Sequence, residues 1–237
     1  MSVGNAMIGQ RFREILYFWW RYLGPLFLVS APFALTTELL QWGFGAAIAL
    51  PDDPNGSITF STTSLILIML LRPLAEGTVI TQLAASRGGK PAGLLACMAP
   101  ALLMYPALLA TYAIIAMGVA LGWLAFFFPA LWVYTRLSFA PYLVVLHRHN
   151  PLRAIRQSFT MTESQQWPLL LVIVLVFLTY TLISSMLASL ISTAVPNIMA
   201  ASLLIALPIS VLSILNNVAI FRFWELAGSP NQDQDQP

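Results

Sequence analysis

The chain has 237 residues, of which 59% are hydrophobic and 8% are charged, and its formal net charge is +2. Soluble globular domains are close to half apolar and a quarter charged, so this composition excludes an ordinary soluble domain. The apolar runs fill most of the chain and leave no room for a separate soluble catalytic domain. We therefore expect an all-α, polytopic membrane bundle that forms one integral membrane domain over residues 1–228. The polar segment 229–237 is low in complexity and is expected to be a disordered tail.

Six stretches of the chain are apolar and long enough to cross a bilayer, which takes about 20 residues of helix. The short connections at Gly118–Gly122 and Ala194–Asn197 are uncharged, and we predict that they link spans three with four and five with six. Several prolines lie within the spans and predict kinked helices. The six predicted transmembrane helices are 22–47, 61–86, 94–117, 121–146, 167–192 and 199–224.

Basic residues gather in alternate connections between the spans. The connection after the first span, Pro51–Gly56, carries only the acidic Asp52 and Asp53. Because Lys and Arg are enriched in cytoplasmic loops, this pattern predicts that both the N-terminus and the C-terminus lie in the cytoplasm. The residues that carry the pattern are Arg11, Arg13, Arg21, Arg87, Lys90, Arg148, Arg153, Arg156 and Arg222.

The segments before the first and fifth spans are basic and amphipathic. In both, basic and apolar residues occupy opposite helical faces, and each segment enters its span at a tryptophan, Trp20 or Trp167. Helices of this kind lie in the headgroup layer of an anionic leaflet. We therefore predict amphipathic interfacial helices whose partners are membrane lipids, including anionic headgroups at the cytoplasmic face, and we expect no nucleic-acid partner.

Two arginines, Arg72 and Arg136, lie inside apolar runs, where a charge costs several kcal/mol or more unless it is paired. With a helical rise of about 1.5 Å per residue, Glu76 and Arg136 fall at a similar depth, and so do Glu38 and Arg72. These depths predict two ion pairs, which the i,i+4 spacing of Arg72 and Glu76 joins into one network. Two amides in the last span lie deep enough to add contacts, so the candidate intramembrane polar cluster is Glu38, Arg72, Glu76, Arg136, Asn216 and Asn217.

Three roles are open for this cluster. Guanidinium groups recognise phosphate and carboxylate groups bidentately, which would make the cluster a headgroup or solute site. Two acids that neutralise two bases would instead hold helices together and leave no net charge to attract a ligand. Carboxylates between membrane helices also serve as proton relays, although no His lies within the spans. A water-accessible cavity that reaches Arg72 or Arg136 would favour transport, whereas a dry and fully paired cluster would favour a structural role.

No motif in the chain names a reaction. We find no glycine-rich phosphate loop, zinc-protease motif, nucleophile elbow or pair of catalytic carboxylates. Cys97 is the only cysteine, which excludes a disulfide or a metal–thiolate cluster within one chain. His147 and His149 are spaced i,i+2, which fits neither a helix face nor the common zinc motifs. We therefore expect no catalytic, cofactor-binding or metal-binding residue, and no enzymatic activity.

The most specific string in the chain is RLSFAPYLVVLHRHNPLRAIRQSFTMT (Arg136–Thr162). It combines a membrane Arg, a Ser and an Ala-Pro with a basic interfacial helix and a Trp-led span. This pattern resembles the YciC family of bacterial inner-membrane proteins and, more distantly, the membrane region that precedes some glycerophosphodiester phosphodiesterase domains. The positions that match are Arg136, Ser138, Pro141, Ala154, Ser158 and Trp167.

The resemblance implies a multi-pass protein of the bacterial inner membrane with a role in envelope maintenance, and it supplies no catalytic residues. No phosphodiesterase domain is expected in this chain, so that activity is not carried over. Our first hypothesis is a non-enzymatic integral membrane protein that supports cell-envelope or membrane-lipid homeostasis. The alternative is a small transporter or channel with a polar midplane site, which kinked helices would favour. An intramembrane enzyme comes third, because no nucleophile–base pair is visible.

Overall fold

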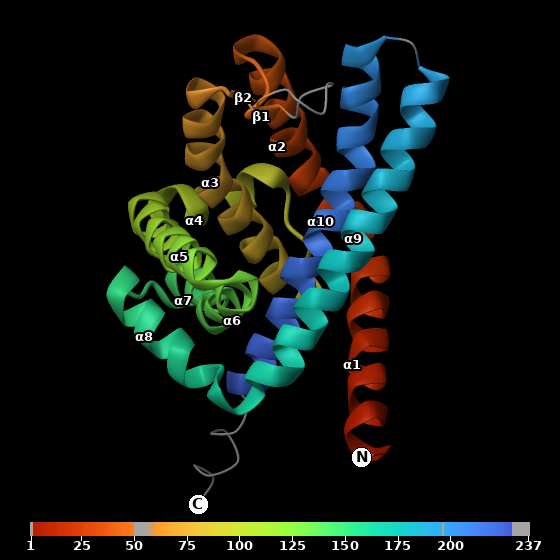
Figure 1. Cartoon of the computed structure of the whole chain (residues 1–237). Helices are drawn as coiled ribbons and strands as arrows, with labels where there is room; N and C mark the ends of the chain where they lie inside the picture. The colour runs from red at the N-terminus through yellow and green to blue at the C-terminus, as the bar shows by residue number, and fades with distance from the viewer. Residues whose placement is uncertain (1, 50–56, 58, 196, 229–237) are drawn as a thin grey trace, which may run out of the picture.

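A computed structural model of the chain describes residues 2–49, 57, 59–195 and 197–228, although the side chains of residues 2–8, 10, 11 and 198 lie outside the description. The predictions made for the Pro51–Gly56 loop and for the 229–237 tail fall outside the described residues. Nearly all of the described chain is helical (Figure 1). The elements are α1 (Ser2–Arg21), α2 (Leu23–Phe44), β1 (Ile48–Ala49), β2 (Thr59–Phe60), α3 (Thr62–Arg87), α4 (Leu94–Leu103), α5 (Tyr105–Ala125), α6 (Phe127–Leu137), α7 (Ala140–His147), α8 (Pro151–Met161), the 3-10 turn η1 (Glu163–Gln165), α9 (Gln166–Ala194) and α10 (Ile198–Gly228).

Five of the described helices are long and apolar enough to cross a membrane by their length and composition. These are α2, α3, α5, α9 with the turn before it, and α10. Four of them, α2, α3, α9 and α10, lie where the first, second, fifth and sixth spans were predicted. The all-α, multi-pass membrane architecture is therefore confirmed at this level.

The third and fourth predicted spans are wrong in their boundaries. The helix is interrupted at Met104, and a new helix begins at Tyr105 with Pro106 in its first turn, so the run 94–117 is divided between α4 and α5. A second break at 138–139 separates α6 from α7, which has Pro141 in its first turn. Proline lacks the N–H that an interior helical position needs, and it is well tolerated in a first turn. Neither α6 nor α7 is long enough to span a bilayer alone.

The residues Gly118–Gly122 do not link two spans, as predicted, but lie inside α5. A Cβ atom on Gly122 would come within 2.6 Å of the Ala130 Cα of α6, and one on Gly118 within 3.1 Å of Val133. Two glycines four residues apart form a flat strip that lets two helix backbones approach closely. The glycines are therefore needed for the α5–α6 contact, and the turn between these helices falls at Phe126.

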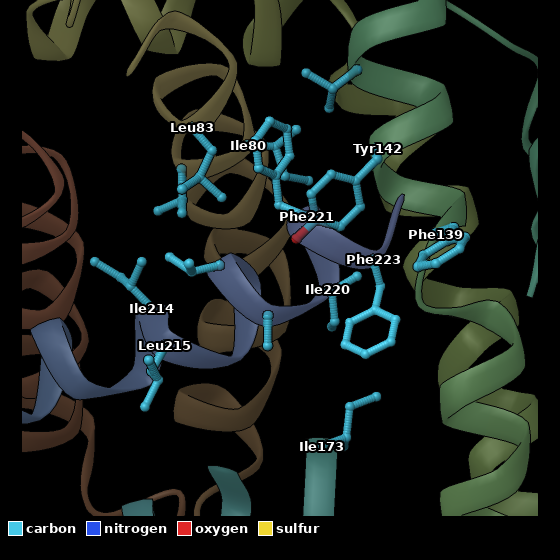
Figure 2. Close-up of a cluster of buried hydrophobic side chains, with 14 of the residues drawn as sticks. Ile80, Leu83, Phe139, Tyr142, Ile173, Ile214, Leu215, Ile220, Phe221 and Phe223 are labelled. Carbon is cyan, nitrogen blue, oxygen red and sulfur yellow. The ribbon is translucent and has the colours of Figure 1, made fainter. Parts of the chain in front are cut away.

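The hydrophobic core is built around the second half of α10. The apolar side chains between Ile214 and Phe223 are buried, with α3 on one side and α7 on the other (Figure 2). The ring of Tyr142 in α7 stacks on Phe221 and on Trp224, with centroids 6.1 Å apart in each case. This packing fixes the rotation of α10 and so decides which of its polar residues face α3.

The two ends of the bundle differ in character. At one end β1 pairs with β2, and the last turn of α9 and the first turn of α10 lie at the same end (Figure 1). At the other end Glu225 of α10 pairs with Arg87 of α3 at 2.7 Å and with Arg222 at 2.9 Å. Arg222 also lies 3.9 Å from Glu14, which brings α1 and the end of α10 together.

The amphipathic helix that was predicted before the fifth span is present as α8. Its buried face carries Ala154 and Ser158, whereas Leu152, Arg153 and Arg156 are exposed. Ser158 donates a hydrogen bond to the Arg136 carbonyl at 2.8 Å, so α8 is fastened to the end of α6.

Candidate functional site

The centre of α3 carries an arginine and a glutamate one helical turn apart. The Nε of Arg72 lies 3.9 Å from the Oε1 of Glu76, which is a long ion-pair contact. The Arg72 side chain is 68% exposed and that of Glu76 is 22% exposed. Among the described residues Arg72 makes no hydrogen bond, so most of its five N–H donors stay available.

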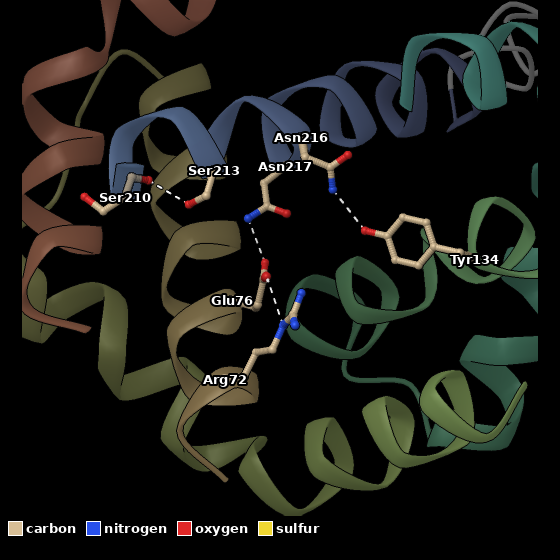
Figure 3. Close-up of polar contacts among 7 residues, drawn as sticks. All are labelled: Arg72, Glu76, Tyr134, Ser210, Ser213, Asn216 and Asn217. Carbon is tan, nitrogen blue, oxygen red and sulfur yellow. Dashed lines mark hydrogen bonds and ion pairs between the residues drawn. The ribbon is translucent and has the colours of Figure 1, made fainter. Parts of the chain in front are cut away.

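Two neighbouring asparagines of α10 connect this pair to the rest of the bundle. Asn217 donates a hydrogen bond from Nδ2 to the Oε2 of Glu76 at 2.7 Å. Asn216 donates from Nδ2 to the hydroxyl of Tyr134 in α6 at 2.9 Å (Figure 3). The two amides therefore point toward different helices, and the bond to the Glu76 carboxylate is the stronger kind because it is charge-assisted.

A cavity of about 440 Å³, here called the central cavity, lies between α3, α5, α6, α7 and α10. Most of its wall is apolar, and a few polar groups converge on it, which is the usual composition of a small-molecule site. Tyr142 donates its hydroxyl hydrogen to the Asn217 carbonyl at 2.8 Å, so this tyrosine is held in place. The polar groups on the wall are Arg72, Glu76, Tyr112, Tyr134, Ser138, Tyr142 and Asn217.

A second cavity of about 280 Å³ lies on the α2 side of the same residues. Arg72, Glu76 and Asn217 line both cavities and so form a polar partition between them. The second cavity is also lined by Thr37 and Glu38 of α2. Glu38, Arg72, Glu76 and Asn217 thus line one cavity, whereas Asn216 is directed to Tyr134.

The predicted ion pair between Glu38 and Arg72 is wrong. Both residues line the second cavity, but among the described residues Glu38 forms no ion pair, and Arg72 lies next to Glu76 instead. The depth estimate placed Glu38 and Arg72 at a similar level, and both residues do line the same cavity. It could not show that open space separates them.

The predicted ion pair between Arg136 and Glu76 is also wrong. Arg136 is 6% exposed and packs its guanidinium over Phe159 of α8, 3.9 Å from the ring centroid, and over Trp132 at 5.7 Å. Its Nε and Nη1 atoms are buried without a hydrogen-bond partner among the described residues. The estimate assumed a straight helix from Arg136 to His147, and the break at 138–139 removes that assumption.

Arg136 is therefore part of the contact between α6 and α8 and not of the midplane cluster. A guanidinium over an aromatic face is stabilised by the ring quadrupole, more strongly where water is excluded. The backbone carbonyl of Arg136 also accepts hydrogen bonds from Ser158 and from Thr162. Arg136 therefore contributes to the packing of the amphipathic helix α8 against the bundle.

Sequence reasoning missed the tyrosines of the central cavity. Tyr112, Tyr134 and Tyr142 lie in apolar helices, and all three line the otherwise largely apolar wall of the cavity. A search for charged residues ignores them, although a tyrosine inside a membrane helix also needs a hydrogen-bond partner. Their occurrence on three helices was the available signal.

The histidines lie away from both cavities. The rings of His147 and His149 contact edge to face with centroids 5.7 Å apart, and His147 lies 5.6 Å from Trp224. Desolvation, with Arg153 and His147 nearby, lowers the pKa of His149, which keeps that ring neutral at neutral pH. Within the described part of the chain no group of three or more His, Cys, Asp or Glu residues is placed to hold a metal ion.

Comparison of the chain with protein-family models, with curated proteins and with solved structures found no match. The chemistry of the site is therefore inferred from its own geometry.

Proposed function

We propose that the protein is a non-enzymatic, multi-pass membrane protein that holds a largely apolar anion, such as a lipid or a lipid precursor, in its central cavity. In this role it acts in membrane-lipid homeostasis of the bacterial cell envelope. The observation that carries the proposal is Arg72, whose side chain is 68% exposed at the middle of a membrane helix and lines an apolar cavity. A guanidinium at this depth is costly unless water or an anion meets it.

The wall of the central cavity indicates the chemical class of the occupant. Arg72 offers a fork of donors that matches a carboxylate or a phosphate bidentately. The carboxylate of Glu76 is engaged by Asn217 at 2.7 Å and does not neutralise Arg72 at close range. Apolar side chains such as Ile80, Leu109 and Ile220 line the rest of the cavity and favour a hydrocarbon chain.

The proposed orientation places the end that carries Arg87 and Arg222 in the cytoplasm, with both chain termini on that side. Lys and Arg are retained on the cytoplasmic side of inner-membrane proteins, which supports this assignment. In this arrangement the α4–α5 and α6–α7 segments together supply the third and fourth crossings. Fusions of alkaline phosphatase and of a fluorescent protein to the C-terminus test the orientation, and phosphatase activity at that end would reverse it.

Binding of radiolabelled palmitate to the full chain in lipid nanodiscs tests the proposed function. We expect palmitate to bind and unlabelled hexadecyl phosphate to compete, whereas hexadecanol, which has the same chain without the charge, competes poorly. Arg72→Ala should weaken palmitate binding by about tenfold to a hundredfold, since it removes hydrogen bonds to a charged group.

Arg153→Ala is the matched control, because Arg153 is an exposed arginine on α8, away from the cavity. It removes the same charge and should leave palmitate binding unchanged. Equal palmitate binding by wild type and Arg72→Ala would overturn the proposal, and so would equal competition by hexadecanol.

The alternative function is transport, and one specific observation favours it. The two cavities share the polar wall formed by Arg72, Glu76 and Asn217. A transporter with a selective barrier in the middle of its solute path would have this arrangement. The single cysteine, Cys97, is fully buried and bonded to Gln82, so a Cys97→Ser chain is a clean background for labelling.

In that background, Thr37→Cys reports on the second cavity and Ala113→Cys on the central cavity. A transporter predicts that each cysteine reacts with a membrane-impermeant thiol reagent, one from each side of the membrane. A holding site predicts that both stay unreactive toward reagent added on either side.

A further inference from the structure

Four arginine side chains line one pocket of about 450 Å³ at the end of the bundle where α1, α3 and α10 meet. Arg13 and Arg21 come from α1, two helical turns apart on one face. Arg87 is the last residue of α3, and Arg222 lies near the end of α10. We call this site the arginine pocket; it is separate from the central cavity.

The arginine pocket has an excess of positive charge. Glu225 forms ion pairs with Arg87 at 2.7 Å and with Arg222 at 2.9 Å, and Glu14 lies 3.9 Å from Arg222. The four guanidinium groups of the pocket thus face two carboxylates, which leaves a net charge of +2. The two α1 arginines, Arg13 and Arg21, are exposed and form no ion pair among the described residues.

Aromatic rings form much of the remaining wall. The Cζ of Arg222 lies 5.7 Å from the ring centroid of Phe18, and that of Arg21 lies 5.8 Å from the centroid of Tyr22. A guanidinium stacked on a ring keeps its edge donors free for an oxygen ligand. Tyr22 directly precedes α2, so the pocket lies where the chain enters its first membrane helix. A ligand of this pocket is therefore expected to be anionic and to reside at the membrane border.

We propose that the arginine pocket binds the phosphate of an anionic phospholipid such as phosphatidylglycerol. Basic pockets between membrane helices at the cytoplasmic side suit such headgroups, and the aromatic wall favours a lipid over free phosphate. A phosphate here connects α1 to the ends of α3 and α10. It adds to the attachments that α1 already has to α10, which are the hydrogen bond from Trp19 Nε1 to the Val211 carbonyl at 3.0 Å and the ring contact of Phe18 with Phe221.

The test is the affinity of the full chain for phosphatidylglycerol, measured by native mass spectrometry, against phosphatidylcholine with the same acyl chains. We expect the wild type to prefer phosphatidylglycerol. The double variant Arg13→Ala/Arg21→Ala should lower that affinity by about thirtyfold, the effect of removing two arginines near an anionic surface. Because both side chains are exposed, we expect the variant to keep its melting temperature in phosphatidylcholine.

The double variant Arg153→Ala/Arg156→Ala is the matched control, since it removes two exposed arginines from α8. Equal losses of phosphatidylglycerol affinity in both double variants would show a general surface-charge effect and overturn the proposal. Unchanged affinity in both double variants would also overturn it.

Inorganic phosphate at millimolar concentration should not displace the lipid; displacement would make this a site for free phosphate. Arg72→Ala should leave phosphatidylglycerol affinity unchanged, and Arg13→Ala/Arg21→Ala should leave palmitate binding unchanged, so the two proposals fail separately.

Discussion

Arg72 and Arg136 are the two arginines that lie within apolar runs of the sequence, and the fold treats them in opposite ways. Arg136 is 6% exposed, and its guanidinium packs against Trp132 and against Phe159 of the amphipathic helix α8. The Arg72 side chain is 68% exposed and reaches into a cavity beside a carboxylate that another residue already holds. The same charged group is used for packing in one region and stays available for an anion in the other.

The comparison teaches that depth in a membrane helix does not decide the role of an arginine. The surroundings differ: Arg136 lies at the end of α6 against Phe159 of the amphipathic helix α8, whereas Arg72 lies on α3 between two cavities. Removing Arg136 should therefore change stability, and removing Arg72 should change binding. Four substitutions test this contrast.

The largest effect on stability is expected from Gly122→Ala, which disturbs the packing of α6, the helix that carries Arg136. The new Cβ would lie 2.6 Å from the Ala130 Cα, so α6 must shift, at a cost of about 3 kcal/mol in the free energy of unfolding. Gly24→Ala is the control, because nothing lies within 4 Å of a Cβ there. Denaturant titration in mixed micelles measures both variants, and equal stability of the two would contradict the close α5–α6 contact.

Arg136→Ala should lower the free energy of unfolding by about 2 kcal/mol through the loss of cation–π and packing contacts. Arg136→Met keeps the volume and removes two buried N–H groups that lack partners, so we expect it to stay within about 1 kcal/mol of wild type. The same titration measures both. Equal instability of the methionine and alanine variants would contradict this expectation, because it would show that the charge of Arg136 is itself required.

Asn217→Ala should cost about 1.5 kcal/mol, because it removes the 2.7 Å hydrogen bond to the Glu76 carboxylate. The freed carboxylate can then move closer to Arg72 and compete with an anionic ligand, so palmitate binding should weaken as well. Asn216→Ala removes only the neutral bond to Tyr134 and should leave binding unchanged. Stronger binding in Asn217→Ala would show that Glu76 does not compete for Arg72.

The smallest effect on stability is expected from Arg72→Ala. Its 3.9 Å contact with Glu76 is long and exposed, and such pairs contribute about 0.5 kcal/mol or less. The melting temperature in detergent should hardly change, although palmitate binding is weakened. A fall in stability as large as that of Arg136→Ala would remove the distinction between the two arginines.

Much of the fold could be predicted from residue patterns alone. The runs that became α2, α3, α9 and α10 are long, apolar and bounded by polar residues, so their positions followed directly. The middle of the chain could not be divided correctly, because a glycine pair looks the same in a turn and in a tight helix contact. Gly118 and Gly122 have the four-residue spacing of a packing motif, but only the close approach of α6 in the structure shows that they lie in a helix contact and not in a turn.

The candidate site was predictable in part for a similar reason. Residues one helical turn apart, such as Arg72 and Glu76, share a face whatever the tertiary structure is, and their contact is confirmed. Pairs between helices depend on axis rotation, tilt and breaks. The chain breaks its helix after Leu137, so Arg136 does not follow the straight-helix estimate, and Glu38 and Arg72 line one cavity without forming an ion pair. Cavities themselves leave no pattern along a chain.

Pro73 lies inside α3, between Arg72 and Glu76, and lines the central cavity next to Met69. Because proline has no N–H, the Met69 carbonyl loses the backbone donor that an α-helix normally gives it. A carbonyl acceptor without its usual helical donor thus lies about one turn from Arg72 on α3. The backbone of α3 therefore has one hydrogen bond fewer than a regular helix at the level where it carries Arg72 and Glu76, so α3 is held less tightly by its own backbone beside the cavity.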